Sequence, residues 1–363
     1  MSWENVKLGD IIEIKKGTYI TKKESKEGPY PVILGGQEPA YYIDTFNHTG
    51  KAIVISRSGA SAGYVSFWNE PIFVTDGFLI EPKNNVNVDF LYYLIKSHQT
   101  ELQGKQGGAA IPHVNPRIIN AIEVKLPLIS IQEQIVERLS AYDDLIENNH
   151  KQIKLLEEAA QRLYKEWFVD LRFPGRETTH IVDGIPQGWK QEPIDEVYSI
   201  KYGKNLPTTE ISEAGKYPVY GANGVIGYYD KFNCDSYVTL ITSRGNGSGD
   251  VSRTHHSNSF VTNNSFVVIP QQTHNFISNE FTYWLMKYTD FKSVCTGSAQ
   301  PQLTNNSVST LKVLIPTKKL ILCFCEITRM YFENIEKLLR QNRLLIEARD
   351  RLLPKLMSGE LEV

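Results

Sequence analysis

Two long segments of the chain carry apolar residues at the alternating spacing of four and three that is typical of a coiled coil. Residues 131–170 contain no Gly or Pro, and their series is Ile135, Leu139, Tyr142, Ile146, Asn149, Ile153, Leu156, Ala160, Leu163 and Trp167. A shift of 189 residues gives a second series in the same phase: Phe324, Thr328, Tyr331, Ile335, Leu338, Asn342, Leu345, Arg349, Leu352 and Leu356. An apolar seam with this repeat predicts two long paired helices, ending at Pro174 and near Gly359, with Pro354 disturbing the last turns of the second.

The rest of the chain has a different pattern of short apolar runs separated by Gly, Asn, Ser and Pro. Such runs are typical of strands joined by loops. We expect strands at 51–57 and 237–244, and short helices at 90–98 and 281–289.

The two halves of the chain repeat one another. Trp3, Ile14 and Gly17 recur as Trp189, Ile200 and Gly203, an offset of 186. Further matches at offsets up to 191 include Tyr30-Pro31-Val32 with Tyr217-Pro218-Val219, Ser56-Arg57 with Ser243-Arg244, and Phe73-Val74-Thr75 with Phe260-Val261-Thr262. A period near 189 residues is far longer than the units of a solenoid, so we interpret the chain as a duplicated domain.

The repeat and the helical segments together predict an α+β protein with pseudo-twofold internal symmetry. Two similar globular domains alternate with two long helices, which we expect to form an antiparallel coiled coil. The predicted boundaries are 1–130 for the first domain, 131–174 for the central helix, 175–188 for a linker, 189–318 for the second domain and 319–363 for the C-terminal helix.

Each helical seam contains one asparagine at a core position, Asn149 and Asn342. Antiparallel pairing about a pseudo-twofold axis would place these residues opposite each other. The same register places Ile135 opposite Leu356, Ile146 opposite Leu345 and Trp167 opposite Phe324. A buried Asn–Asn contact would fix the register at a cost in stability. The alternative is a solvated asparagine at a frayed part of the seam.

Composition places the chain among folded proteins but gives no sign of a polyanionic partner. Hydrophobic residues make up 41% and charged residues 22%. The 39 basic and 41 acidic residues give a formal net charge of −2, so charge alone argues against nucleic-acid binding. The sequence lacks an apolar run of about 18 residues, a secretory N-terminus and a disulfide-like cysteine spacing. We therefore expect a cytoplasmic protein with reduced thiols and no membrane contact.

Enzyme signatures are weak. The run GNGSGD at 245–250 lacks the lysine and spacing of a P-loop. The only Asn-Pro pair, at 115–116, is not followed by the Pro-aromatic pair of an amino-methyltransferase tetrad. His255-His256 and Cys323-x-Cys325 lack zinc-ligand spacing, so no metal site is predicted. A metal-dependent nuclease with Asp76, Glu81 and Lys83, or with the second Glu-x-Lys pair Glu123 and Lys125, remains an alternative. However, the second half does not repeat either pattern.

The duplicated layout and several local motifs resemble the specificity (S) subunit of type I restriction–modification systems. The motifs are WFVDLRFPG at 167–175, IPQGWK at 185–190, TGSAQPQL at 296–303 and LLPKLMSGEL at 352–361, and the resemblance covers essentially the whole chain. It implies that each globular domain is a target-recognition domain that reads one half of a bipartite sequence in double-stranded DNA. It also implies that the long helices set the spacer between the halves and dock two methyltransferase subunits.

The resemblance further implies a non-catalytic chain with no cofactor of its own. S-adenosylmethionine, Mg²⁺ and ATP would belong to the methyltransferase subunits and to restriction/translocase subunits. The near-zero charge then predicts weak DNA binding by the isolated chain, because partners would supply many of the phosphate contacts.

Candidate DNA-contacting residues lie in the loops of the two domains. Arg57 and Arg244 each follow a strand and precede a flexible run, and arginine can read guanine or bind phosphate. The alternative is a surface arginine paired with a carboxylate. Amide side chains that could contact adenine, or could be turn residues, are Gln37, Asn223, Asn246, Asn263 and Asn264. Candidates for phosphate or backbone contacts in glycine-containing loops are Gln106, Ser298 and Gln300.

A rigid pair of helices is suited to separate two half-sites. From Ile135 to Trp167 an α-helix rises about 48 Å, which exceeds the DNA helical turn of about 34 Å.

The remaining alternative to a DNA-recognition function is a coiled-coil adaptor whose lobes bind protein.

Overall fold

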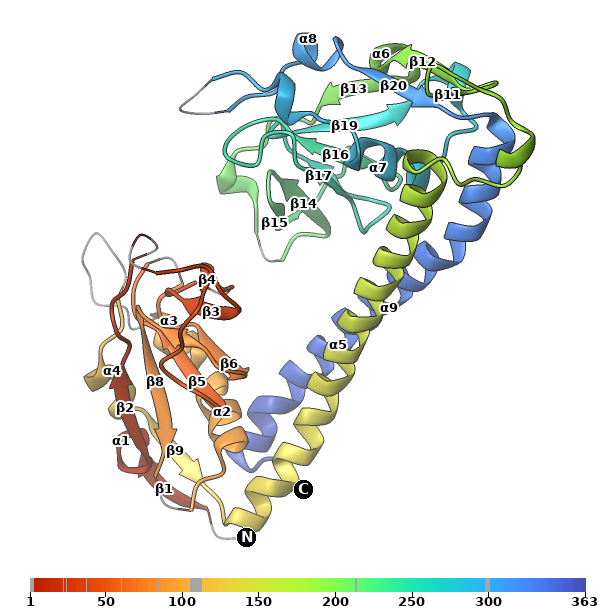
Figure 1. Cartoon of the computed structure of the whole chain (residues 1–363). Helices are drawn as coiled ribbons and strands as arrows, with labels where there is room; N and C mark the ends of the chain where they lie inside the picture. Colours follow the sequence, from red (N-terminus) through yellow and green to blue (C-terminus); the bar gives the residue numbers. More distant parts are fainter. Residues whose placement is uncertain are drawn as a thin grey trace. The chain divides into compact units, whose positions relative to one another are not determined.

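A computed structural model describes residues 3–363 except 22, 24, 37, 60, 84, 105–112, 213 and 298–300. The chain forms two compact units that do not follow its linear order. Unit 1 comprises Met1–Glu147 and Asn342–Val363, and unit 2 comprises Asn148–Gln341. Each unit therefore contains one globular lobe and parts of both long helices (Figure 1). We call residues 3–126 lobe 1 and residues 189–315 lobe 2.

Lobe 1 is built from three small sheets. Its four-stranded antiparallel sheet has the order β2-β8-β5-β6, with β2 at Ile12–Lys16, β8 at Gly77–Pro82, β5 at Lys51–Ser56 and β6 at Val65–Asn69. In the three-stranded sheet, β3 (Tyr30–Ile33) pairs antiparallel with β4 (Tyr41–Ile43) and parallel with β7 (Phe73–Val74). The outer ladder joins β1 (Glu4–Lys7) to β9 (Glu123–Leu126).

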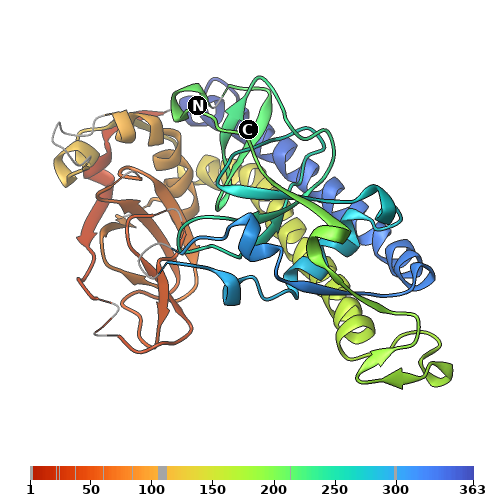
Figure 2. The ribbon, with the colours of Figure 1, turned by 90° about the horizontal axis from the view of Figure 1, so that it is seen from above.

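Lobe 2 has the same topology, so the structure confirms the repeat. The order β13-β19-β16-β17 reproduces the four-stranded sheet, with strands Tyr198–Tyr202, Ser265–Pro270, Thr239–Thr242 and Val251–Arg253. The order β15-β14-β18 reproduces the three-stranded sheet, with strands Gly224–Tyr229, Tyr217–Gly221 and Phe260–Val261. The outer ladder joins β12 (Lys190–Pro193) to β20 (Lys312–Ile315). Unit 2 also contains a short hairpin of β10 (Ile181–Val182) and β11 (Ile185–Pro186), which projects beyond the end of the central helix (Figure 2).

Short helices occupy matching places in the two lobes. The predicted helices are α2 (Val88–Ser97) and α7 (Asn279–Lys287), which begin at the capping side chains of Asn87 and Ser278. The other matched pairs are α1 (Leu8–Ile11) with α6 (Ile194–Val197), and α4 (Pro116–Asn120) with α8 (Asn305–Val308). Lobe 1 also has α3 (Gln99–Gly104). Single 3₁₀ turns lie at Arg176–Thr178, Thr208–Glu210, Gln272–His274 and Lys292–Val294.

Two long helices carry the predicted seam. Helix α5 spans Ile129–Tyr164 and continues through one π-helical turn, Lys165–Val169. Helix α9 spans Lys318–Ser358 and runs through Pro354 without ending there. Every seam position of both helices is buried or half-buried. Together with the two lobes, these helices confirm the predicted α+β class.

The antiparallel pairing is visible within each unit. In unit 1, Ile135 and Leu139 of α5 belong to the same apolar core as Leu356 of α9. In unit 2, the rings of Trp167 and Phe324 lie 6.2 Å apart, between centroids, within the other core. Each helix thus contributes its first part to one lobe's core and its last part to the other's.

Arg349, the charged residue in the second seam, has a specific partner. Its Nη1 lies 2.5 Å from Asp143 Oδ1 on α5, and Tyr93 of α2 donates to the other oxygen of that carboxylate at 2.5 Å. This contact joins lobe 1 to both helices and explains how the seam accepts a charge. In unit 2, Arg253 of β17 has the corresponding role. Its guanidinium lies 3.5 Å from Glu157 on α5 and 4.2 Å from the ring centroid of Phe332 on α9.

The two seam asparagines are both buried. Asn149 and Asn342 each have 4% of their surface exposed, which disagrees with the alternative of a solvated, frayed position. Asn149 belongs to unit 2 and Asn342 to unit 1. Their role in fixing the register stays a prediction.

The repeated glycines Gly17 and Gly203 are required by close backbone packing. A Cβ on Gly17 would lie 2.4 Å from the carbonyl oxygen of Thr75, and a Cβ on Gly203 would lie 2.3 Å from that of Thr262. These distances are far below a van der Waals contact, and the obstructing atoms are backbone.

We predict that Gly17→Ala destabilises the protein by about 2 kcal/mol or more, because the loop after β2 must move away from the end of β7. Denaturant or thermal unfolding measures the change. Gly104→Ala is the matched control, since a Cβ there meets no atom of the described residues within 4 Å. Equal stability of the two variants would contradict the packing argument.

Candidate nucleic-acid interface

Polar loops meet at one end of the four-stranded sheet in lobe 1. Strand pairing places Ser56 at the end of β5 opposite Gly77 at the start of β8. The next residue, Arg57, donates its backbone N–H to Asp76 O at 3.3 Å, and its own carbonyl accepts from Val114 N at 2.9 Å. Gly17 N donates to Gly77 O at 3.0 Å. We call residues 17–18, 56–59, 75–77 and 113–114 the lobe 1 loop cluster.

Arg57 is held by a carboxylate from the neighbouring loop. Its Nε lies 3.0 Å from Asp76 Oδ1, and Ser58 Oγ donates to Asp76 Oδ2. The Arg57 side chain is 49% exposed and that of Asp76 is 25% exposed. The guanidinium is therefore oriented by its neighbour while about half of the side chain faces solvent.

The corresponding loops of lobe 2 meet in the same way. Ser243 N donates to Asn264 O at 2.9 Å, and Leu303 N donates to Ser243 O at 2.9 Å. The hydroxyl of Thr242 donates to Ala222 O at 2.8 Å, which ties the β14–β15 turn to the loop after β16. We call residues 203–204, 222–224, 242–248, 262–264 and 301–303 the lobe 2 loop cluster.

Arg244 has a different environment from Arg57. It is exposed and forms no ion pair with any residue that the structure describes. The strand registers pair Ser56 with Gly77 and Thr242 with Ser265, so Ser243 and Asn264 occupy the places of Arg57 and Asp76. Arg244 lies one residue further along, and an amide stands in place of the carboxylate of lobe 1.

Most of the predicted amide residues also lie in the lobe 2 loop cluster. Asn223, Asn246 and Asn264 are exposed, and Asn263 is half-buried. A Cβ on Gly247 would lie 3.6 Å from Asn223 Oδ1, so the β14–β15 turn and the loop after β16 are in contact. Four candidates lie outside the described residues: Gln37, Gln106, Ser298 and Gln300.

Two asparagines that hold short strands, and two exposed apolar residues of β15, were not predicted from the sequence. Asn47 accepts from Val74 N at 2.8 Å and donates to Val74 O at 2.9 Å, directly before Thr75 and Asp76. Asn233 makes the same pair of bonds with Val261, at 2.8 and 2.9 Å. In the sequence, the repeated Phe-Asn pair at 46–47 and 232–233 could have indicated these two asparagines.

Close to Asn223 in the sequence, Val225 and Ile226 of β15 are nearly half exposed. Exposed apolar side chains can contact thymine methyl groups.

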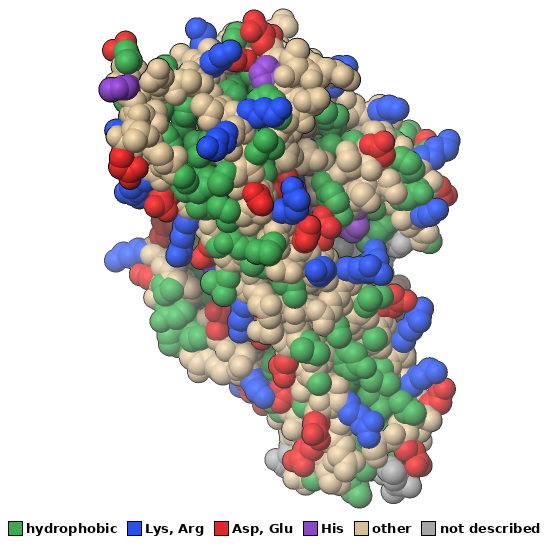
Figure 3. Space-filling view, turned by 90° about the vertical axis from the view of Figure 1, so that its right-hand side faces the viewer, with side chains coloured by type: hydrophobic (Ala, Val, Ile, Leu, Met, Phe, Trp, Pro, Cys, Tyr) green, Lys and Arg blue, Asp and Glu red, His purple; other side chains and the backbone are tan. Residues whose placement is uncertain are grey.

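Charge is mixed on the face of the molecule that Figure 3 draws. On the face drawn in Figure 3, Lys and Arg alternate with Asp and Glu, and hydrophobic side chains are exposed between them. Within the loop clusters, the Lys, Arg, Asp and Glu residues are Arg57 and Asp76 in lobe 1 and Lys204 and Arg244 in lobe 2. Each cluster therefore offers hydrogen-bond donors and acceptors more than a strong positive field. This arrangement suits base-edge contacts better than non-specific phosphate binding.

The residues of the nuclease alternative do not form a cluster. Asp76 is engaged by Arg57 and Ser58, whereas Glu81 Oε2 lies 2.5 Å from Lys15 Nζ at the other end of β8. Lys83 Nζ donates to Gly9 O at 2.9 Å. No group of three His, Cys, Asp or Glu side chains that could hold a metal occurs among the described residues.

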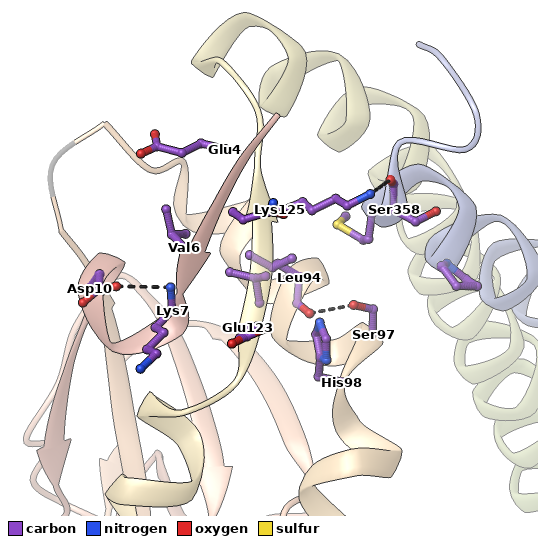
Figure 4. A pocket seen from close by; sticks show the side chains of 14 residues that line it. Glu4, Val6, Lys7, Asp10, Leu94, Ser97, His98, Glu123, Lys125 and Ser358 are labelled. Atoms are coloured by element: carbon purple, nitrogen blue, oxygen red, sulfur yellow. Dashed lines mark hydrogen bonds between the residues drawn. The ribbon is translucent and has the colours of Figure 1, made fainter. Parts of the chain in front are cut away.

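An open groove lies elsewhere in unit 1. It has a volume of about 1080 Å³ and runs between the β1–β9 ladder, the end of α2 and the last turns of α9 (Figure 4). Lys7 and Lys125 line it together with Glu4, Asp10 and Glu123, so its charges are mixed. Lys125 Nζ donates to Ser358 O at 3.2 Å. In lobe 2 the position of Ser97 is occupied by Tyr288, which stacks on Tyr164 with centroids 5.3 Å apart. Figure 1 shows β1 and β9 at the end of lobe 1 opposite to β3 and β4, so the groove is distant from the loop cluster.

Comparison with known proteins agrees with the duplicated architecture. The family model described as the type I restriction modification DNA specificity domain matches residues 1–158 and 186–321. The type I restriction enzyme MjaIX specificity subunit of Methanocaldococcus jannaschii is 26% identical over 99% of this chain and 94% of its own length. The HindI specificity subunit of Haemophilus influenzae is 21% identical over 79% of this chain and 80% of its own length.

A crystal structure shares the fold. The S subunit of a type I restriction–modification system from M. genitalium superposes with a TM-score of 0.56 at 22% identity, covering 98% of this chain and 96% of that one. Within the described part of the chain, no helix is both long and apolar enough to cross a membrane.

Proposed function

Because the chain belongs to the family of type I restriction–modification DNA specificity domains, we propose that it selects the DNA sequence for a type I restriction–modification complex. The observation that carries this proposal is the loop cluster that recurs at the same sheet end in both lobes, with an arginine after the same strand. Base-edge recognition needs such exposed donors held on a rigid frame.

Each lobe would read one half of a bipartite target. Lobe 1 would use Arg57, and lobe 2 would use Arg244 with Asn223, Asn246, Asn263 and Asn264. The four candidates outside the described residues, Gln37, Gln106, Ser298 and Gln300, belong to the same proposal. Because the loops differ in sequence between the lobes, the two halves of the target should differ.

The long helices would set the spacer between the halves and bind two methyltransferase subunits. Several apolar side chains on these helices are exposed, which supports a protein partner: Leu145, Leu155, Leu322, Ile327, Met330, Leu344 and Ile346. Restriction/translocase subunits would join the same complex.

The chemistry would belong to those partners. S-adenosylmethionine would be bound by the methyltransferase subunits, and Mg²⁺ and ATP would be used by the other subunits. This chain would contribute recognition alone, without a catalytic residue, and would act in the cytoplasm.

A gel-shift comparison tests the recognition role. With both methyltransferase subunits present, we expect binding to target duplex to be about 10³-fold or more tighter than to random duplex. The chain alone should bind weakly, because its net charge of −2 offers little phosphate affinity. A complex in which Arg57 and Arg244 are both replaced by Ala is the matched variant and should lose most of the preference. Assembly without any DNA binding would instead favour a protein-binding adaptor.

Insertion of one heptad into each long helix tests the role of the helices. Seven residues add about 10 Å of helix, equivalent to roughly three base pairs. Placing the insertions after Ile146 and before Leu345 preserves the predicted register. We expect the unread spacer of the target to lengthen, or binding to be lost, as measured by binding to duplexes of graded spacer length. An unchanged spacer would contradict this role.

A further inference from the structure

We infer that Asp76 makes Arg57 a guanine-reading side chain, so that lobe 1 requires a G·C pair at one position of its half-site. Lobe 2 lacks this arrangement and should discriminate less strictly through Arg244. The inference rests on the proposed function and adds to it the chemistry of one base contact.

The ion pair with Asp76 occupies one edge of the guanidinium. Arg57 Nε lies 3.0 Å from Asp76 Oδ1, and the other carboxylate oxygen of Asp76 accepts from Ser58 Oγ. The backbone carbonyl of Asp76 accepts from Arg57 N at 3.3 Å. Side chain and backbone contacts thus join the same two residues, which limits the directions in which the guanidinium can point.

The remaining edge suits guanine. A guanidinium has five N–H donors in a planar fork, and a carboxylate at Nε leaves the two Nη groups as a pair of parallel donors. Guanine presents two acceptors, O6 and N7, in the major groove, whereas adenine presents an acceptor beside a donor. A guanidinium whose direction is restricted loses less conformational entropy on binding than a mobile one. It also adapts less well to a base other than guanine.

The internal repeat supplies a natural comparison. In the sequence Arg244 follows Ser243 as Arg57 follows Ser56. The strand registers, however, place Ser243 opposite Asn264 as Arg57 lies opposite Asp76, so Arg244 lies one residue further along and the amide of Asn264 replaces the carboxylate. A neutral amide cannot form the ion pair, and Arg244 forms none with any other described residue. Arg244 therefore keeps more rotational freedom and can contact either a base or a phosphate.

The competing interpretation is that the Arg57–Asp76 pair is an ordinary surface ion pair. Such pairs contribute little to stability, so loss of Asp76 should leave the lobe folded under either interpretation. The two interpretations differ in what they predict for base discrimination at a single position.

The test uses the full complex with its methyltransferase subunits and its cognate duplex. Each base pair of the lobe 1 half-site is replaced in turn, and the binding constant is measured for the unchanged complex and for Asp76→Asn. We expect one G·C pair whose replacement weakens binding by about tenfold to a hundredfold in the unchanged complex. Asp76→Asn should reduce that penalty to about threefold or less while leaving the penalties at other positions unchanged. Combining Asp76→Asn with Arg57→Ala should add nothing to Arg57→Ala alone.

Glu81→Gln is the matched control, because Glu81 forms an exposed ion pair with Lys15 on the same sheet. It should leave every penalty unchanged. Arg57→Lys keeps a positive charge beside Asp76 but has no planar pair of donors, so it should lower the penalty at the same G·C pair, and it tests the inference even if Asp76→Asn fails to fold.

The inference is wrong if the lobe 1 half-site has no sensitive G·C pair, or if Asp76→Asn weakens all duplexes equally. Failure of the unchanged complex to prefer any sequence would instead refute the proposed function itself.

Discussion

The burial of one continuous apolar seam is the constraint on which the rest of the structure depends. Helix α5 places Ile135 in the core of unit 1 and Trp167 in the core of unit 2, and α9 contributes Phe324 and Leu356 in the opposite order. Neither lobe completes its core without both helices. Asp143, which contacts both Arg349 and Tyr93, and the ion pair of Arg253 with Glu157 then attach a lobe to the helices within each unit.

Duplication supplies two copies of one frame, and substitution at the loops makes them different. The frame is conserved within the chain at the residues that hold β7 and β18: the amides of Asn47 and Asn233, and the glycines Gly17 and Gly203. The loops that these residues support differ where a base would be contacted, as with Asp76 and Asn264. A fixed frame with variable loops permits a change of target without a change of fold.

The heptad spacing and the repeat were sufficient to predict the helices, the lobes and the antiparallel pairing, because both patterns are periodic and extend over many residues. Local pairings were harder to predict. The ion pair between Arg57 and Asp76 joins loops 19 residues apart, and the two-way amide bonds of Asn47 reach across 27 residues. The charge of Arg349 within the seam is matched by Asp143 on the facing helix, 206 residues away in the sequence. Such contacts depend on tertiary proximity, which spacing along the chain does not encode.

Methylation-sensitive long-read sequencing of DNA from a host that carries the complex tests the central claim most directly. The account predicts a bipartite methylated motif: two different specified segments separated by unspecified bases of constant number. A continuous motif, or methylation that does not depend on this chain, would contradict it.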